Sequence, residues 1–290
     1  MKRILVAVAI LMATVEGFAQ TDTTKNSKED TVQVGNFVII KKPKKSVRIS
    51  VGSDKGVDVT INSDSSNRKK SNVSTNWWIL DLGFTNLRDE TDYASAQAGP
   101  YLRTMGTTPS PVNANSMKLR SGKSSNVNLW FFMQKLNVSK HVLNLKYGLG
   151  LEMYNFRYEN SLSYRKDNNG PYVFNDSIGF SKNKLYAGYI TAPLMININA
   201  TPHRKKGFNL SAGVSAGYLV GSRNKQVSDS RGKVKYKGDF NLQPFRLAAV
   251  AELGLGPIRL YGSYSLNKLH RDETRLEQYP YAIGIRFSNW

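Results

Sequence analysis

The sequence predicts an all-β protein: an eight-stranded antiparallel transmembrane β-barrel with a flexible N-terminal periplasmic extension. Three observations predict it. Apolar and polar residues alternate in eight segments after residue 76, long and short connections separate these segments in turn, and the chain begins with an export-type segment. A mean hydropathy of −0.42 fits this fold, because only every second residue of a barrel strand faces lipid.

The first residues follow the pattern of a secretory signal. Lys2 and Arg3 precede an apolar run over residues 4–13, and residues 17–19 place small side chains at the −3 and −1 positions of a cleavage site. This pattern predicts a signal peptide over residues 1–19. The apolar run is too short to cross a bilayer comfortably, so we expect the mature chain to be exported.

Residues 20–75 form a predicted basic periplasmic extension, with clusters of Lys and Arg at 41–45 and 68–70. Two short alternating segments, 47–51 and 57–61, flank a turn-like stretch and predict a hairpin. An isolated hairpin is marginally stable in water. We therefore expect this region to be largely flexible.

The predicted barrel occupies residues 76–290, where a period of two dominates. In each segment one face is apolar and the other is rich in Gly, Ser, Asn and charged residues; in the second, the alternation places Phe131 and Met133 on the apolar face and Trp130 and Phe132 on the opposite face. The eight segments run over residues 78–84, 126–133, 143–153, 189–198, 208–218, 245–253, 258–266 and 281–288.

The connections between these segments alternate in length. The longer ones are residues 87–122, 159–183, 222–241 and 268–278, and the short ones are 136–141, 200–207 and 254–257. Outer-membrane barrels have short periplasmic turns and long outer loops. With both termini periplasmic, every long connection lies outside the cell. A soluble β-sandwich shares the alternation of residues but has no reason to sort its loops in this way.

The formal charge of +20, from 41 basic and 21 acidic residues, would suggest nucleic-acid binding in a soluble protein. An exported chain does not meet genomic DNA, so we expect no nucleic-acid partner. Two explanations stay open: solvated loop charge, or contact with outer-membrane lipids and phosphorylated lipopolysaccharide. The last strand, which ends at Trp290, predicts recognition by the barrel-assembly machinery. The basic extension predicts a periplasmic protein or the cell wall as a partner.

Charged residues occupy inward positions of the predicted strands. An eight-stranded barrel has a lumen that side chains fill, and an unpaired buried charge is costly. We therefore expect these residues to form a structural network of ion pairs that plugs the lumen, with a narrow ion path as the alternative. The residues are Asp81, Lys146, Glu152, Arg246, Glu252, Arg259 and Arg286.

No catalytic, cofactor or metal site is expected. The chain has no cysteine and only 3 histidines, which are widely spaced. His270 lies near Asp272 and Glu273, and Ser263 and Ser265 point inward on the preceding segment. A Ser–His–acid group is the chemistry that this set would suggest. One histidine among acids in a short charged loop is usually solvated, so we expect no enzyme activity and no cofactor.

Two strands carry motifs of a known family. Residues 189–194 read YITAPL and residues 213–218 read GVSAGY. They resemble the YLxxPL and GxxxGY strands of the PorT-like outer-membrane β-barrel family of Bacteroidetes, with Ile190 in place of Leu, and the similarity covers residues 77–290. The resemblance implies a Gram-negative outer membrane. The best-known family member assists protein secretion and gliding, but no functional residue carries over.

The function expected from the sequence is that of a non-enzymatic barrel with a structural or interaction role. An accessory role in a secretion or gliding system and a small channel or transporter are the alternatives.

Overall fold

The computed structural model describes residues 30–34, 37–42, 46–51, 59–62, 71–105, 110–201, 207–255 and 258–288. The expected signal peptide and Trp290 lie outside these residues. The chain divides into two compact units, Met1–Lys70 and Ser71–Trp290. No helix in the described residues is long and apolar enough to cross a membrane.

The first unit contains a four-stranded antiparallel sheet. Its strands follow one another in the order β1 (Asp30–Val34), β2 (Phe37–Lys42), β3 (Ser46–Val51) and β4 (Val59–Asn62). The predicted hairpin corresponds to β3 and β4, which pair at Ile49↔Val59. The sequence interpretation missed β1 and β2. Their addition gives the sheet more than the two strands that are marginal in water, so this unit has more regular structure than a single hairpin.

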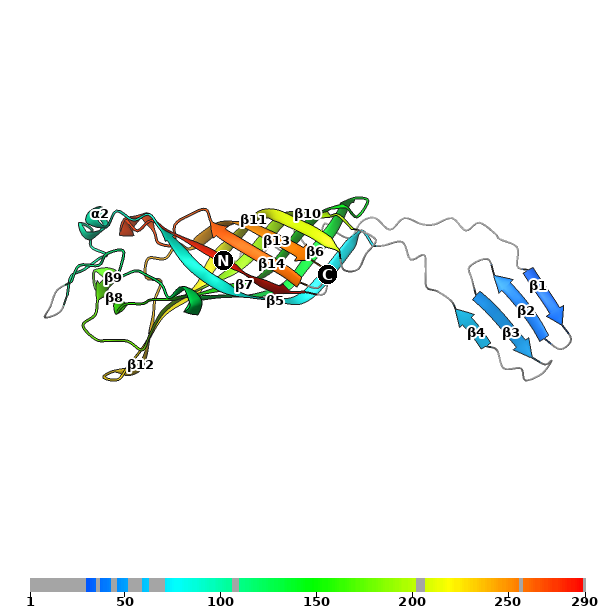
Figure 1. Cartoon of the computed structure of the whole chain (residues 1–290), viewed down its shortest axis with the longest axis horizontal. Coiled ribbons are helices and arrows are strands. Elements are labelled where there is room, and N and C mark those ends of the chain that lie inside the picture. The colour runs from blue at the N-terminus through cyan, green and yellow to red at the C-terminus, as the bar shows by residue number, and fades with distance from the viewer. Residues whose placement is uncertain are drawn as a thin grey trace. The chain divides into compact units, whose positions relative to one another are not determined.

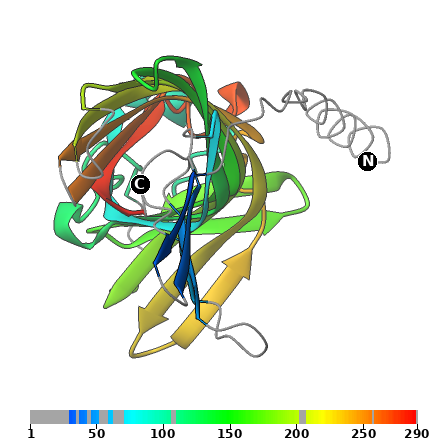
Figure 2. The ribbon, with the colours of Figure 1, turned by 90° about the vertical axis from the view of Figure 1, so that its right-hand side faces the viewer.

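The second unit is a closed antiparallel barrel. The strand order around the ring is β10-β7-β6-β5-β15-β14-β13-β11, and β10 pairs with β11 to close it, as the end-on view of Figure 2 shows. This ring confirms the predicted eight-stranded fold. The strands are β5 (Val73–Asp89), β6 (Ser125–Ser139), β7 (Leu143–Arg157), β10 (Lys182–Asn199), β11 (Phe208–Ser228), β13 (Phe245–Leu255), β14 (Ile258–Ser265) and β15 (Gln278–Phe287).

The four long connections lie at one end of the barrel and the short ones at the other (Figure 1). The long connections carry α2 (Tyr93–Gln97), η1 (Ser121–Lys123), the hairpin of β8 (Leu162–Asp167) and β9 (Gly170–Asn175), β12 (Gly232–Lys237) and η2 (Asp272–Thr274). β12 pairs with the end of β11. Part of the long connection expected at 222–241 is therefore strand.

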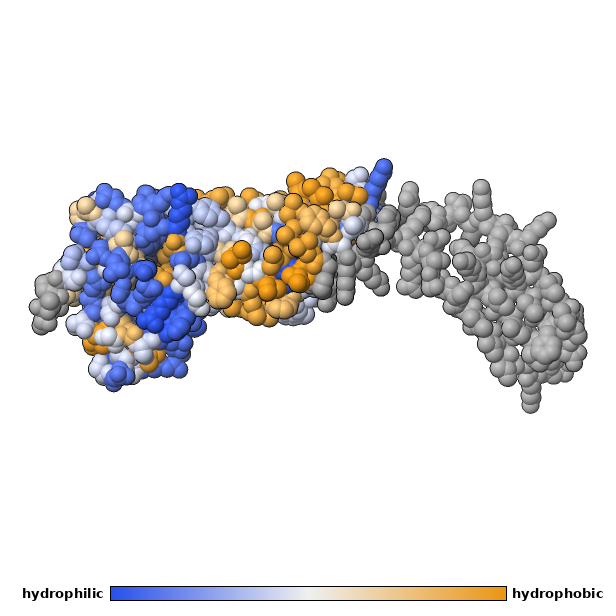
Figure 3. Space-filling model, viewed as in Figure 1, coloured by the Kyte–Doolittle hydropathy of each residue, from blue (hydrophilic) through white to orange (hydrophobic). Residues whose placement is uncertain are grey.

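A belt of exposed apolar side chains surrounds the strands. Its members alternate along each strand with buried polar residues, and Figure 3 shows the belt as orange next to the hydrophilic end that carries the long connections. An apolar surface of this extent on a folded chain marks contact with a partner or a membrane. Members on successive strands include Leu82, Leu194, Val214, Leu247 and Ile283.

The alternation predicted for β6 is wrong at its end. The register between β6 and β7 shifts between Trp130 and Phe132, so Phe131 and Phe132 are both partly exposed and Met133 is buried. A bulge of one residue moves every following side chain to the opposite face. The sequence pattern could not show this shift, because Phe and Met are apolar on either face.

Candidate functional site

The lumen of the barrel holds the charged residues that the sequence placed there. All seven are buried, and they come from β5, β7, β13, β14 and β15. The structure brings them into two ion-paired groups, one around Glu252 and Asp81 and the other around Glu152. The residues are Asp81, Lys146, Glu152, Arg246, Glu252, Arg259 and Arg286.

Glu252 is the acid with the most basic partners in this network. Its Oε2 accepts hydrogen bonds from Lys146 Nζ and from Arg286 Nη1, each at 2.5 Å. Arg259 Nη1 approaches Oε1 at 3.4 Å. Charge-assisted hydrogen bonds of this kind are stronger than neutral ones. One carboxylate therefore compensates three cations that come from three different strands.

Arg286 links Glu252 to Asp81. Its guanidinium binds the Asp81 carboxylate in a bidentate way, with Nε–Oδ1 at 2.7 Å and Nη2–Oδ2 at 2.8 Å. Asp81 Oδ2 also accepts hydrogen bonds from Trp130 Nε1 at 2.7 Å and Asn128 Nδ2 at 3.2 Å. The Asp81 carboxylate thus loses little of the stabilisation that water would give it.

Glu152 forms the second group. It accepts a hydrogen bond from Arg246 Nη1 at 2.7 Å and another from Thr191 Oγ1 at 3.2 Å. Arg246 Nε donates to Ser265 Oγ at 2.8 Å, and the guanidinium lies 4.8 Å from the centroid of the Tyr154 ring. Three acids and four bases nearly balance in the lumen, which is the condition for burying them together.

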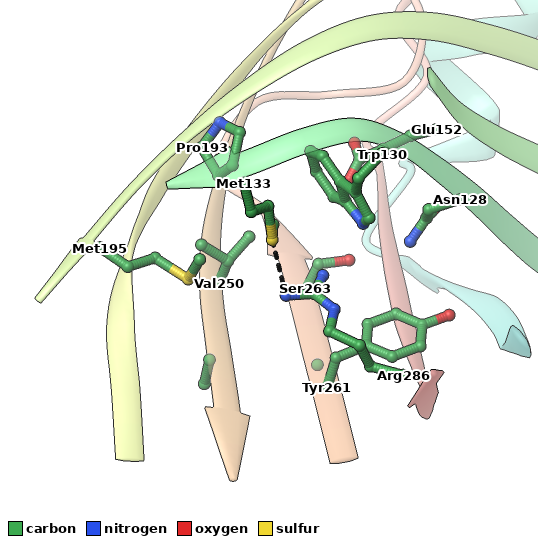
Figure 4. A pocket seen from close by; sticks show the side chains of 12 residues that line it. Asn128, Trp130, Met133, Glu152, Pro193, Met195, Val250, Tyr261, Ser263 and Arg286 are labelled. Carbon is green, nitrogen blue, oxygen red and sulfur yellow. Dashed lines mark hydrogen bonds between the residues drawn. The ribbon is translucent and has the colours of Figure 1, made fainter. Parts of the chain in front are cut away.

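The space that remains between the two groups is small. A cavity of about 20 Å³ is lined by residues that include Trp130, Glu152, Tyr261 and Arg286 (Figure 4). A volume of this size accommodates roughly one water molecule. The arrangement supports a packed, ion-paired interior beside this cavity.

Two glycines make room for an aromatic side chain in the lumen. Gly83 on β5 and Gly284 on β15 are direct cross-strand partners, and the Tyr261 ring from β14 lies against both. The Tyr261 hydroxyl then donates to Asn126 Oδ1 on β6 at 2.7 Å. One side chain therefore reaches from β14 to β6 over two intervening strands, which is possible because neither glycine carries a Cβ.

Gly284→Ala is expected to destabilise the barrel by about 1–3 kcal/mol, the usual effect of overpacking. A Cβ at this position would stand 2.7 Å from Tyr261 Cε1 and would also collide with the backbone of Leu82 and Gly83. The measurement is the free energy of unfolding in phospholipid vesicles. Gly221→Ala is the matched control, because no heavy atom lies within 4 Å of its added Cβ. Equal losses for the two variants would contradict the packing role of Gly284.

The long connections pack into a hydrophobic cap at their end of the barrel. Its core is rich in buried aromatic residues from β7, β8 and the connections, including Tyr101, Tyr154, Tyr158, Tyr164 and Phe240. The hydroxyls of Tyr158 and Tyr164 lie 2.6 Å apart, and Tyr101 donates to the carbonyl of Phe240 at 2.7 Å. The sequence interpretation missed this cap, because its residues are scattered over connections without a period.

The candidate Ser–His–acid set is not assembled. His270 is completely buried in the cap, where its ring lies near those of Tyr101 and Tyr164, and neither ring nitrogen has a hydrogen-bond partner. Ser263 Oγ lies 3.4 Å from the hydroxyl of Tyr154, and Ser265 Oγ accepts from an arginine of the lumen. The expectation of a solvated His270 is wrong: the tyrosine-rich cap covers it.

The acids of this set also lie apart from His270. Asp272 borders a surface hollow of about 330 Å³, where Lys268 approaches it at 3.3 Å, and Glu273 begins the short helix η2 with it. In the part of the chain that the structure describes, no group of three or more His, Cys, Asp or Glu residues is placed to hold a metal ion.

Burial lowers the pKa of His270 to about 3. Between about pH 6.5, the ordinary pKa of a histidine, and pH 3, His270 binds a proton in the unfolded chain but stays neutral in the folded cap. The stability that neutral His270 contributes is complete above about pH 6.5 and is lost as the pH falls toward 3. We expect protease protection of the cap to decrease over this range.

His270→Phe is expected to remove this part of the pH dependence, because phenylalanine does not titrate. The cap should still fold, because the side chain stays aromatic and no hydrogen bond is lost. Limited proteolysis between about pH 7 and pH 4 measures it, within the window set by the two pKa values. His141→Gln, in the turn between β6 and β7, serves as the control and should behave like the original chain. A pH dependence that survives in His270→Phe would refute this role.

The closed ring, the apolar belt and the polar, filled lumen together define an integral outer-membrane β-barrel. The chain belongs to the family described as outer membrane protein beta-barrel domain, whose family model matches residues 99–271. Membership in this family supports localisation in the outer membrane. A search of curated proteins finds no match to the chain.

Proposed function

We propose that this protein is a non-enzymatic outer-membrane barrel with a structural or interaction role and a closed lumen. The observation that carries the proposal is the network around Glu252, Asp81 and Glu152, in which every acid is bound by at least one buried base. The small cavity beside this network supports it further. The protein would then act through its insertion in the membrane and through contacts that its exposed parts make with other molecules.

In this proposal residues 1–19 direct export and both termini are periplasmic, with the four long connections outside the cell. The collection of these connections at one end supports this orientation. The YITAPL and GVSAGY motifs support a PorT-like barrel of a Gram-negative bacterium of the Bacteroidetes.

The proposed partners follow from the same orientation. The apolar belt contacts outer-membrane lipids, and the basic side chains at the long-connection end contact lipopolysaccharide. The alternating strand β15 supports recognition by the barrel-assembly machinery. The basic extension, which contains the sheet β1–β4, would meet a periplasmic protein or the cell wall.

Planar-bilayer conductance tests the closed lumen. The purified full chain should insert without steady large openings, because ion pairs and aromatic side chains fill the barrel. Steady openings would contradict the proposal and favour a small channel or transporter. Heat-modifiable gel migration of the same sample checks that the barrel has formed: a folded barrel should migrate differently before and after boiling.

An accessory role in a secretion or gliding system is the second candidate. The folded sheet β1–β4 favours it, because a paired sheet offers a defined docking surface. Deleting residues 20–70 from the full chain tests this role, since the deletion leaves the barrel unit of Ser71–Trp290 complete. Impaired secretion with an intact barrel would support the accessory role, and normal secretion would remove its main support.

A further inference from the structure

Basic side chains form a continuous array on the outward face of β7, β10, β11 and β12, which we call the basic ladder. One row of direct cross-strand partners runs Arg157↔Lys184, Lys184↔Lys225 and Lys225↔Lys235. The other members lie two residues before or after this row on the same strands, so they share its face. The ladder comprises Arg157, Lys182, Lys184, Arg223, Lys225, Lys233, Lys235 and Lys237.

All charges of the ladder have the same sign. None of its residues forms an ion pair with an acid among the residues that the structure describes. Side chains of direct cross-strand partners lie roughly 5 Å apart at Cβ, and like charges at that separation are destabilising. A bound external anion would relieve this repulsion.

A bulge in β11 turns the side chains of Arg223 and Lys225 outward. The register between β10 and β11 passes from Gly188↔Gly221 to Tyr189↔Leu219, which leaves Val220 without a partner. Before the bulge the even-numbered residues of β11 face outward. After it Asn224 is buried, while the odd-numbered ladder residues of this strand face outward. Without this extra residue, Arg223 and Lys225 would point into the barrel.

The ladder begins where the apolar belt ends. On β11, Tyr218 and Val220 belong to the belt, with 50% and 58% of their surface exposed. At about 3.3 Å per residue and a tilt of about 40°, Arg223 lies ~8 Å and Lys225 ~13 Å beyond Val220 along the membrane normal. The headgroup layer outside the hydrocarbon is ~5–8 Å thick. Arg223 therefore stands at the outer edge of the headgroup layer, and the row of Lys184, Lys225 and Lys235 stands ~5 Å above that edge.

The geometry of individual side chains suits a phosphate ligand. The Arg223 guanidinium lies over the Tyr186 ring, 4.5 Å from its centroid, so the two side chains pack against each other. The Nε atoms of Arg157 and Arg223 are buried and have no hydrogen-bond partner. Arginine forks and lysine ammonium groups are the donors that proteins use for phosphate. Figure 1 shows β12 and the end of β11 extending this face beyond the ring.

We propose that the basic ladder binds the headgroup of a membrane glycolipid that carries more than one phosphate, in the leaflet on the long-connection side. This inference rests on the proposed function, because it requires a barrel inserted to the edge of its apolar belt. It adds to that function a specific lipid site formed by four strands. The position directly above the apolar belt, from the outer edge of the headgroup layer outward, favours a lipid with an extended phosphorylated headgroup over a free anion as the source of the phosphates.

The test measures binding of a bisphosphorylated glucosamine-disaccharide lipid to the purified full chain in detergent micelles, by native mass spectrometry. The ladder variant combines Lys184→Gln, Lys225→Gln and Lys235→Gln. We expect its affinity to fall about 100-fold, since each basic residue near an anionic lipid surface contributes a factor of roughly five. The control combines Lys123→Gln, Lys140→Gln and Lys166→Gln, which removes the same charge from exposed positions outside the ladder, and its affinity should remain unchanged.

Two further arms identify the ligand chemistry. The same glycolipid without phosphates should bind the original chain weakly, and inorganic phosphate should not displace the phosphorylated lipid at comparable concentration. Equal losses in the two triple variants, no loss in the ladder variant, equal binding of both lipids, or ready displacement by inorganic phosphate would each overturn the ladder site. In these cases a normal heat-modifiable shift leaves the proposed barrel function standing, whereas absence of the shift overturns both.

Discussion

Glu252→Gln is expected to lower the free energy of unfolding by about 3–5 kcal/mol, the usual effect of removing one partner from a buried ion pair. The neutral amide would leave Lys146, Arg259 and Arg286 close together inside the barrel with one carboxylate fewer. Their mutual repulsion would then act where solvent screening is weak. Urea denaturation of the chain folded in phospholipid vesicles measures the loss.

Two further variants separate this effect from a general loss of negative charge. Glu159→Gln removes the same charge from an exposed ion pair with Lys118, and exposed pairs contribute little. In a double-mutant cycle, Lys146→Met should recover part of the loss in the Glu252→Gln background, because one of the mutually repelling cations is removed. A loss as small as that of Glu159→Gln would show that the lumen charges are hydrated and that the closed interior is wrong.

Tyr164→Ala is expected to destabilise the cap by about 3–5 kcal/mol, as for other large aromatic side chains removed from a core. The ring is fully buried, lies 5.5 Å from the ring of Phe240 between centroids and stacks on His270 at 6.3 Å. Its loss also leaves the Tyr158 hydroxyl without its partner. Because Tyr164 lies on β8, which is outside the ring of eight strands, proteolysis of the long connections should accelerate while heat-modifiable migration persists.

Tyr172→Ala provides the matched control on the same hairpin. Tyr172 is partly exposed and packs against the guanidinium of Arg103 rather than in the cap core. Its removal should change protease sensitivity much less. Similar cleavage rates for the two variants would indicate that the long connections do not form a cooperative core around Tyr164.

The sequence predicts the barrel well because two patterns, residue alternation and connection length, do not depend on how individual side chains pack. The alternation of Leu143 to Met153 and of Leu210 to Tyr218 fixes which face of each strand is apolar, and connection length fixes which strands are neighbours. The inward positions of Asp81 and Glu252 follow from the same period. Which base pairs with which acid depends on the stagger of strands that are distant in sequence. The sequence therefore could not predict that Arg286 links Asp81 to Glu252.

Bulges and non-local packing account for what sequence reasoning missed. The register shifts near Phe131 and Val220 reverse the faces of the residues that follow, and neither position carries a distinctive residue. The basic ladder did leave a signal: Lys233, Lys235 and Lys237 alternate with Val234 and Tyr236 inside a segment expected to be a loop. Alternation within an otherwise polar connection therefore indicates a strand, here β12.

The seams between barrel strands are unequal in length, and this predicts a mechanical role for the lumen network. β14 and β15 pair from Leu260↔Ile285 to Tyr264↔Tyr281, whereas β10 and β11 pair from Lys182↔Val227 to Asn199↔Asn209. Under tension the ring should open first at the short seam beside its final strand. The bond from Arg286 on β15 to Glu252 on β13 passes over β14 from within, so it acts as a latch across that seam. Pulling on β15 by force spectroscopy should therefore require less force in Glu252→Gln, and an unchanged rupture force would exclude the latch.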